Sequence, residues 1–451
     1  MSASSAAVQV SPEDLKKEHL NVVFIGHVDV GKSTLSGQIL YLSGQVDERT
    51  IQKYEREAKE KNRQSWWLAF IMDTNEEERA KGKTVEVGRA PFVTATKRYT
   101  ILDAPGHAKY VPNMISGAAQ ADVGVLVISA RRSEFESGFN RGGQTREHAM
   151  LAMTLGVRRL IVAINKMDEE TVEWSEERFN EIKDKLTPFL RKQGFKPKKQ
   201  VAWVPISAFT GANVVEQYKE CKWYTGPSLM QILDGLSGFN RKPDDALRVP
   251  VFDRFKDRGS TTALGKVESG TLNVGDKVVL MPNNVETEVT GIELDLYGDV
   301  DTAPPGENVQ IKLKGVSTKE LGPGMVLCSP ESVTPVGDIL EAQMMIRNIS
   351  DVFSAGYTCV LHIHTVTVEV EVKKIQAILD PKTGKKLPKR CTFVENGALI
   401  SAILQTDRPI CVETFQNYQQ LGRFTLRSGG NTVAQGKVTR IGDSSKKRSR
   451  K

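Results

Sequence analysis

The sequence predicts an α/β domain followed by two antiparallel β-barrels. Strand-like apolar runs alternate with helical patterns from about Glu18 to about Leu236, which is typical of a parallel sheet with helices on both faces. Helical periodicity fades near residues 238–243, where short alternating strands with glycine turns begin. A second break at residues 329–335 precedes another set of alternating strands.

The length of the chain agrees with this division, because 451 residues are too many for one ordinary hydrophobic core. We expect a disordered N-terminal segment, the α/β domain, two barrels and a basic tail, at residues 1–16, 17–238, 246–330, 335–443 and 444–451. The expected strands of the α/β domain are residues 22–25, 99–102, 123–128, 160–164 and 201–205. Those of the barrels are residues 249–255, 265–270, 277–281 and 309–313, then 342–346, 358–364, 398–404 and 423–426.

The composition is that of an ordinary globular protein, with 26% charged and 39% hydrophobic residues. No apolar stretch reaches the length of a membrane span, and the first residues lack the pattern of a secretory signal. The five cysteines are scattered without a C-x-x-C pair, which favours a reducing cytoplasm over a disulfide framework or a zinc site. The net charge is +7, but five positive charges stand at residues 446–451, so bulk charge does not indicate nucleic-acid binding. That tail either contacts RNA phosphates or is a solvated end.

Two pairs of side chains favour a structural role. Trp66 and Trp67 follow a charged helical segment at residues 47–62, and we expect them to pack rather than to form a binding platform. His362 and His364 share one face of an expected strand. No third ligand is nearby in sequence, so packed histidines are favoured over a metal site.

The first expected strand leads into the motif G-x-x-x-x-G-K-S, in the order strand, glycine turn and helix that a phosphate-binding loop requires. The glycines let backbone N–H groups point inward around a di- or triphosphate, and the helix N-terminus adds positive potential. Lys32 would reach the β- and γ-phosphates, and the Ser33 hydroxyl would ligate Mg²⁺. The nucleotide-binding residues predicted here are Gly26, His27, Val28, Asp29, Val30, Gly31, Lys32, Ser33 and Thr34.

The motif N-K-M-D at residues 165–168 closes another expected strand and indicates which base is bound. The Asp168 carboxylate can accept hydrogen bonds from guanine N1–H and from its N2 amine. Adenine would leave this buried carboxylate facing a lone pair, a mismatch that can cost a factor of about 10⁴ or more in selectivity. Asn165 can add an amide contact to the base edge, and the Lys166 stem can cover the face of the base. Ser207 and Ala208 follow a further strand and would offer a backbone N–H to guanine O6.

The motif D-A-P-G-H at residues 103–107 ends the second expected strand. Asp103 is placed to hold Mg²⁺ through water, and the Gly106 N–H to contact the γ-phosphate. A glycine at that position permits a peptide flip when the phosphate leaves. His107 stands where a residue could orient the attacking water, which makes it the candidate catalytic residue.

The order of these motifs resembles that of the translational GTPases, which implies a phosphate-loop GTPase domain before the two barrels, with GTP or GDP and Mg²⁺ as cofactors. Residues 73–84 resemble the first switch segment of that family, and this implies Thr84 as the second hydroxyl ligand of Mg²⁺, beside Ser33 and Asp103. Residues 143–149 match the helix after the fourth strand.

Residues 82–90, 135–139 and 422–427 decide the branch, and they resemble the eukaryotic class-II peptide-chain release factors. This chain has Lys83 where the elongation factor that delivers aminoacyl-tRNA typically has isoleucine. The resemblance extends from about Lys16 to Asp443. Many release-factor GTPases carry a long N-terminal extension, but fewer than twenty residues precede Leu20 here. Contacts of such an extension, including those to poly(A)-binding protein, are therefore not carried over.

The resemblance implies a switch of translation termination that binds the class-I release factor and acts on the ribosome, which would stimulate hydrolysis of GTP to GDP and phosphate. We expect a cytoplasmic protein that is a monomer within a heterodimeric complex. One alternative is a tRNA-delivering, elongation-factor-like GTPase, which the three segments disfavour. The other is a non-catalytic nucleotide-gated binding module, which His107 and Thr84 disfavour.

The predicted partner-binding residues are Arg423, Phe424 and Arg427, in a segment that alternates as a strand. Phe424 shares one face with Leu426, and the two arginines share the other face. The pattern alone favours a core face and a solvated face. Because the segment marks the release-factor branch, we expect Arg423 and Arg427 to face the class-I factor.

Overall fold

The computed structural model describes residues 13–61, 66–73, 78, 84–140, 143–239, 241–257, 260–347, 349, 352–387 and 392–444. The chain divides into two compact units, Met1–Met153 with Val157–Phe239, and Thr154–Gly156 with Asn240–Lys451. The expectations for the first twelve residues, for Lys83 and most of the first switch segment, and for the basic tail lie outside the described residues.

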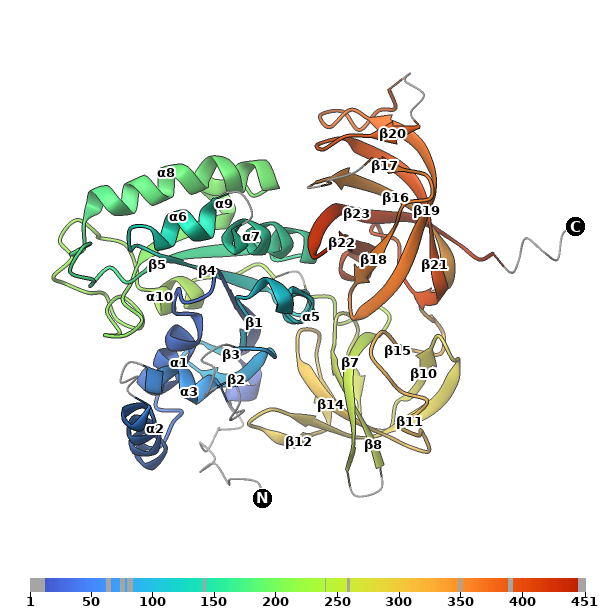
Figure 1. The fold of residues 1–451 in the computed structure, drawn as a ribbon. Helices are drawn as coiled ribbons and strands as arrows, with labels where there is room; N and C mark the ends of the chain where they lie inside the picture. Colours follow the sequence, from blue (N-terminus) through green and yellow to red (C-terminus); the bar gives the residue numbers. More distant parts are fainter. Residues whose placement is uncertain are drawn as a thin grey trace, which may run out of the picture. The chain divides into compact units, whose positions relative to one another are not determined.

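A six-stranded sheet forms the centre of the first unit, in the order β2-β3-β1-β4-β5-β6 (Figure 1). The strands are β1 (Glu18–Ile25), β2 (Gly88–Val93), β3 (Lys97–Asp103), β4 (Val123–Ser129), β5 (Arg159–Asn165) and β6 (Val201–Pro205). Neighbours pair in parallel except β2 and β3, so the predicted parallel sheet is confirmed. The edge strand β2 was not predicted. It contains Pro91, which cannot donate a ladder hydrogen bond and is tolerated at an edge.

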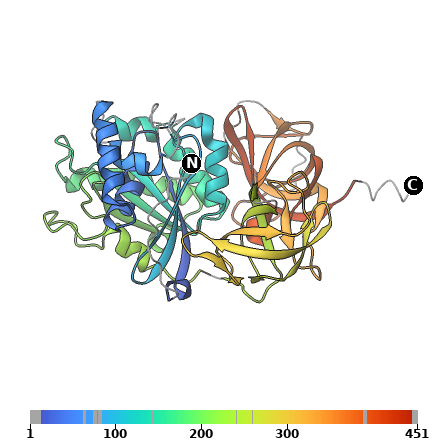
Figure 2. The ribbon, with the colours of Figure 1, turned by 90° about the horizontal axis from the view of Figure 1, so that it is seen from below.

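Helices cover both faces of this sheet, as Figures 1 and 2 show. They are α1 (Lys32–Leu42), α2 (Glu48–Glu60), α3 (Trp67–Met72), α5 (Val111–Ala119), α6 (Glu134–Phe139), α7 (Gln144–Leu155), α8 (Glu176–Gln193), α9 (Pro197–Gln200) and α10 (Leu229–Asp234), with 3-10 turns η1 (Asp14–Lys16) and η3 (Ala108–Tyr110). In Figure 1, α6, α7 and α8 lie on one side of β4 and β5, and α1 and α10 on the other. Because strand side chains alternate between faces, Val22 and Phe24 of β1 share one core with α1 and α10.

Local sequence signals explain where the longer helices begin and end. The Asp47 carboxylate accepts a hydrogen bond from the Thr50 N–H at 2.9 Å and caps α2, within the segment predicted to be helical. Ser175 caps α8 in the same way, and Gly194 ends that helix with a φ of 105°. Trp67 packs as predicted, with its ring edge-on to Tyr41 at 5.4 Å.

Six antiparallel strands close the first barrel of the second unit, in the order β10-β15-β7-β8-β14-β11, because β10 also pairs with β11. They are β7 (Arg248–Asp257), β8 (Ser260–Lys266), β10 (Lys277–Met281), β11 (Val285–Leu294), β14 (Asn308–Leu313) and β15 (Val326–Cys328). Three short strands add to it, β9 (Leu272–Asn273), β12 (Gly298–Val300) and β13 (Thr302–Ala303). The expected strand at residues 265–270 is wrong in its bounds, since β8 ends at Lys266 and Gly270 turns with a φ of 72°.

The second barrel is closed in the order β16-β21-β19-β18-β22-β23. Its strands are β16 (Val336–Ile346), β18 (Thr358–Ile363), β19 (Val366–Leu379), β21 (Leu399–Cys411), β22 (Arg423–Ser428) and β23 (Asn431–Gly442), with the small pair β17 (Phe353–Ser354) and β20 (Phe393–Val394) and the short helix α11 (Gln419–Gly422). The two predicted barrels are therefore confirmed, although the long strand β19 was not foreseen.

A buried ion pair joins the two barrels. Arg248 of β7 donates to Glu413 at 3.0 Å, and the two side chains are only 2% and 3% exposed. Arg248 also donates to the Ser332 carbonyl at 2.7 Å and lies 4.9 Å from the ring of Tyr418. Apolar side chains from both barrels also form one buried cluster, made of Val279, Met281, Val326, Cys328, Cys411 and Leu421. The barrels thus share a buried interface.

Two of the three predicted partner-binding residues are buried, which corrects that prediction. Phe424 is 0% exposed and belongs to the core of the second barrel, because its face of β22 points inward. Arg427 is 5% exposed, and its guanidinium donates to the Thr432 hydroxyl at 3.1 Å and to the Gly430 carbonyl. Neither side chain offers a surface to a partner. Arg423 is half-buried and stays a candidate.

Phe424→Ala should destabilise the second barrel by about 3–5 kcal/mol, because it removes a fully buried ring and leaves a cavity. Denaturant unfolding followed by circular dichroism measures this change. Val352→Ala in the same barrel is the matched control, since Val352 is 59% exposed and its truncation should be nearly neutral. Equal stabilities for the two variants would show that Phe424 does not carry the core.

Candidate functional site

The glycine loop after β1 has the backbone geometry of a phosphate-binding loop. Gly26 and Gly31 adopt φ angles of 149° and 92°, in the region that favours glycine. A Cβ atom on Gly26 would lie 2.4 Å from the Val127 carbonyl oxygen, so no other residue fits. The Gly26 N–H donates to Nδ1 of the buried His148 at 3.0 Å. The loop is therefore fixed at its first glycine, and the predicted helix α1 follows it directly from Lys32.

Lys32 lies where two predicted loops meet. Its ammonium donates to the His27 carbonyl at 2.7 Å, and a Cβ atom on Gly106 would lie only 2.4 Å from the Lys32 nitrogen. Burial lowers the pKa of Lys32 to about 8, while Asp103 and Asp29 act in the opposite direction. A buried ammonium between the glycine loop and the D-A-P-G-H loop is suited to bind the terminal phosphates of a nucleotide.

The three predicted Mg²⁺ ligands converge beside Lys32. The Ser33 and Thr84 hydroxyls are 3.1 Å apart, and Thr84 also donates to the buried Asp73 carboxylate at 3.3 Å. Asp103 is 0% exposed, and burial raises the pKa of its carboxyl group to about 6. Neither carboxylate oxygen of Asp103 has a hydrogen-bond partner at normal bonding geometry. The nearby Ser33 hydroxyl and Lys32 ammonium still favour the charged form of the carboxylate and act to lower its pKa.

This donor set fits a magnesium ion. Mg²⁺ binds hard oxygen ligands and keeps several waters, so one or two carboxylates and hydroxyls beside phosphates suffice. The orphaned Asp103 carboxylate would gain a partner from the ion or from its water. Asp73 joins the set as a residue that lay in the predicted switch segment without an assigned role.

His107 stands at the mouth of the same site. It precedes the 3-10 turn η3, and its ring nitrogen Nδ1 accepts a hydrogen bond from the Lys109 N–H at 3.2 Å. The ring is half-buried and lines the pocket together with Gly106. This position agrees with the predicted role beside the γ-phosphate, which stays a prediction.

The residues predicted to recognise guanine gather at the other end of the pocket, but the hydrogen bonds of Asn165 and Ala208 differ from expectation. The Asn165 amide donates to the Val30 carbonyl at 2.8 Å and accepts from the Ala208 N–H at 2.8 Å. Asn165 thus ties the glycine loop to the Ser207–Ala208 loop, and the Ala208 N–H offered to guanine is already used. Asp168 lines the pocket and its side chain is exposed there, so its predicted contact with guanine stays a prediction.

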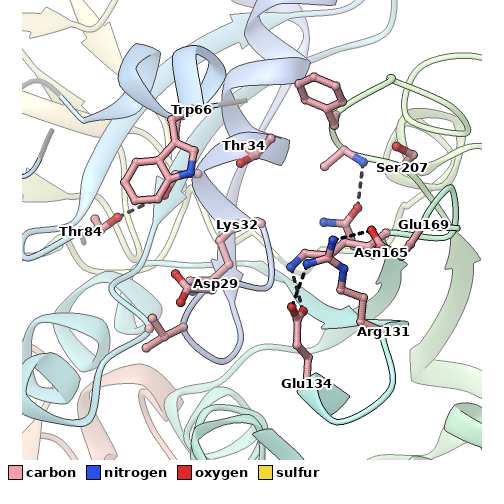
Figure 3. A pocket seen from close by; sticks show the side chains of 18 of the residues that line it. Asp29, Lys32, Thr34, Trp66, Thr84, Arg131, Glu134, Asn165, Glu169 and Ser207 are labelled. Atoms are coloured by element: carbon pink, nitrogen blue, oxygen red, sulfur yellow. Dashed lines mark hydrogen bonds and ion pairs between the residues drawn. The ribbon is translucent and has the colours of Figure 1, made fainter. Parts of the chain in front are cut away.

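One pocket of about 470 Å³ collects most of the predicted residues (Figure 3). Its predicted lining residues are Val28, Asp29, Gly31, Lys32, Ser33, Thr34, Thr84, Gly106, His107, Asn165, Lys166, Asp168, Ser207 and Ala208. The pocket lining does not include Gly26, His27, Val30 and Asp103. In Figure 3, Trp66 and Thr84 lie on one side of Lys32, and Asn165, Arg131 and Glu134 on the other.

Sequence reasoning missed several lining residues: Trp66, Ala69, Asp73, Arg131, Glu134, Glu169 and Phe209. Trp66 was expected to pack like Trp67, yet it faces the pocket. Phe209 follows the Ser207–Ala208 pair directly and is 52% exposed, which is unusual for an aromatic ring. Arg131 and Glu134 follow β4, and the rule that strand ends carry functional residues could have found them.

The two strand histidines of the second barrel have partners. His364 donates to the Cys411 carbonyl at 2.9 Å, and His362 lies 3.2 Å from the Thr367 hydroxyl. Burial lowers the pKa of each to about 4, so both are neutral at pH 7. Within the part of the chain that the structure describes, no helix is long and apolar enough to cross a membrane.

Family models match all three domains. The elongation factor Tu GTP binding domain matches residues 17–238, elongation factor Tu domain 2 matches residues 260–328, and the GTP-eEF1A C-terminal domain-like model matches residues 339–439. The GTPase-like domain of Ski7 from Saccharomyces cerevisiae, solved with GDP and inorganic phosphate, aligns with a TM-score of 0.77 over 94% of this chain and 97% of that chain. The identity of 15% supports a shared fold alone.

Curated relatives are more similar in sequence. A eukaryotic peptide chain release factor GTP-binding subunit of Zygosaccharomyces rouxii is 48% identical over 429 residues, which are 94% of this chain and 64% of the relative. The protein of the same name from Dictyostelium discoideum is 49% identical over 448 residues, which are 97% of this chain and 79% of the relative. The chain thus spans a little under two thirds of the first of these relatives.

Asp168→Asn should shift nucleotide preference from GTP toward xanthosine triphosphate by about 10²-fold or more, because the new amide donates where the carboxylate accepted. Competition binding with the two triphosphates measures this ratio. Glu170→Gln is the matched control, an exposed neighbour that does not line the pocket. Full retention of GTP preference in Asp168→Asn would remove Asp168 as the residue that reads the base.

Proposed function

This chain belongs to the family of eukaryotic peptide chain release factor GTP-binding subunits, and we propose that it is a GTP-hydrolysing switch of translation termination. The observation that supports the proposal most is the pocket in which Lys32, the Ser33–Thr84 hydroxyl pair and the guanine loop meet. The name that the relatives share indicates translation termination as the process, and the residues of the pocket support GTP hydrolysis as the chemistry.

Different residues of the site bind different parts of GTP. Lys32 and the backbone N–H groups of the glycine loop hold the phosphates, and Asp168 selects guanine. Ser33, Thr84 and Asp103 would hold Mg²⁺, which neutralises charge on the phosphates when bound. Through its two hydrogen bonds, Asn165 holds the phosphate-binding loop and the base-binding loop in a fixed position relative to each other.

His107 orients the attacking water, and Gly106 senses the γ-phosphate. The Cβ position of Gly106 approaches both the Lys32 nitrogen and the His27 carbonyl oxygen, at 2.4 and 2.9 Å. Glycine is therefore required for the D-A-P-G-H loop to lie this close to the phosphate-binding loop. Loss of the γ-phosphate releases Gly106 and Thr84, which converts hydrolysis into a change of conformation.

The partners of this switch are a class-I peptide-chain release factor and the ribosome, in the cytoplasm. A ribosomal stimulus is needed because unassisted phosphate-loop GTPases are slow, and stimulation is commonly worth about 10³–10⁵ in rate. We assign part of the class-I factor's binding surface to Arg423, whose half-buried guanidinium lies 5.0 Å from the Phe415 ring and donates to Gln419 at 3.1 Å.

His107→Ala should leave GTP binding within about threefold of wild type and lower ribosome-stimulated hydrolysis by about 10²-fold or more, since one positioned catalytic group is lost. Single-turnover phosphate release, with ribosomes and with or without the class-I factor, measures the rate. Lys109→Ala, an exposed side chain in the same turn, is the control. An unchanged stimulated rate in His107→Ala would make His107 a packing residue, and wild-type protein without stimulated hydrolysis would overturn the proposed function.

Arg423→Ala should weaken binding of the class-I factor by about 2 kcal/mol or more, as truncation of a central interface arginine commonly does. Isothermal titration calorimetry on the purified proteins gives the affinity, and GDP binding should stay unchanged. Arg440→Ala provides the comparison, because Arg440 is an exposed arginine of β23 in the same barrel. Wild-type affinity in Arg423→Ala would place the interface elsewhere on the barrels.

A further inference from the structure

Four charged side chains connect the two loops at the base end of the pocket. We call them the base-end brace: Arg131 and Glu134 from the loop and helix after β4, and Lys166 and Glu169 from the loop after β5. The strands are parallel neighbours, and Ser129 and Asn165 at their ends are register partners. All four side chains line the pocket.

Glu134 is the centre of the brace. One carboxylate oxygen accepts from the Lys166 ammonium at 2.8 Å and from the Ser129 hydroxyl at 2.7 Å, and the other accepts from Arg131 at 3.2 Å. Burial alone would raise the pKa of Glu134, but the hydrogen bonds from Lys166 and Ser129 outweigh it and lower the pKa. Glu134 is therefore a carboxylate at neutral pH and holds Lys166 by charge.

Arg131 extends the base-end brace to the residue that follows Asp168, the residue proposed to select guanine. Its second guanidinium nitrogen donates to Glu169 at 2.5 Å, and Glu169 follows Asp168 directly. Figure 3 shows the Arg131, Glu134 and Glu169 side chains turned toward one another at this end of the pocket. The loop after β5, which contains Asp168, is thus held by ion pairs at both ends, at Lys166 and at Glu169.

We propose that Glu134 is a positioning residue that holds the Lys166 stem in place over the guanine base and thereby slows nucleotide release. A free lysine side chain samples many rotamers, and ordering it on binding costs conformational entropy. The Lys166 backbone is already fixed at a φ of 62°, and the ion pair with Glu134 fixes the end of the side chain. Pre-organised in this way, the stem adds to the binding of the base without that entropic cost.

The inference rests on the proposed function, because it deepens the role of the guanine nucleotide site. Glu134 does not read the base, since its carboxylate oxygens are used by Lys166, Ser129 and Arg131. Its effect should therefore appear in the lifetime of the complex and leave the preference for guanine, set by Asp168, unchanged.

The test measures dissociation of GDP that carries a fluorescent N-methylanthraniloyl group, chased with excess GDP. Glu134→Gln should accelerate dissociation about three- to tenfold, the range expected for loss of a partly exposed, charge-assisted contact. The matched control is Glu136→Gln on the same helix. Glu136 is paired with Arg178 at 3.1 Å and similarly exposed, but it does not line the pocket, and its variant should stay within about twofold of wild type.

A double-mutant cycle separates positioning from general stability. Lys166→Met keeps most of the stem but removes the ammonium, so it should accelerate release as much as Glu134→Gln does. Glu134→Gln should then have no further effect in the Lys166→Met background. If thermal unfolding shows that Glu134→Gln does not fold, Lys166→Met is sufficient by itself to test the inference.

Each other outcome overturns the inference. An unchanged rate in Glu134→Gln, fully additive effects in the double variant, or equal acceleration in Glu136→Gln would each exclude a positioning role through Lys166. Wild-type protein that binds no GDP would overturn the proposed function itself. Wild-type binding with an unchanged Glu134→Gln rate would overturn only the role of Glu134.

Discussion

Two opposite charges buried in one small volume govern the nucleotide site. Lys32 and Asp103 are 6% and 0% exposed, and burial moves their pKa values toward neutrality from opposite sides, to about 8 and about 6. Parallel pairing of β1 with β3 brings these loops together, since Phe24 and Asp103 are register partners. Desolvated charges need compensation, and a phosphate chain with a divalent cation would supply it to both at once.

The remainder of the site keeps this arrangement in place. Hydrogen bonds from Gly26 to His148 and from Asn165 to Val30 fix the glycine loop at its beginning and near its end. Because Asn165 also accepts from Ala208, the phosphate end and the base end form one connected structure. One amide side chain therefore connects the two ends of the pocket.

Local patterns predicted the parts of the molecule that depend on local sequence. The glycine loop, the N-K-M-D loop and the strands before them follow from glycine spacing and apolar runs, and so does the order of an α/β domain and two barrels. The bridge made by Asn165 joins segments far apart in sequence, which no local pattern reveals. The brace around Glu134 was missed for a similar reason, because its partner Lys166 lies 32 positions away. The strand β19, by contrast, carries a local signal, because its valines alternate with polar residues.

The buried pair Arg248–Glu413 restricts how the two barrels can change through evolution. Each barrel contributes one charge to an interface in which the side chains are 2% and 3% exposed. Replacing one barrel by a relative's version that lacks the matching charge would leave the charge of the other barrel buried without a partner. This would lower the stability of the protein by roughly 3–5 kcal/mol. Recombination between related genes should therefore transfer the barrels as a pair, with crossovers tolerated before residue 248 more readily than between the barrels.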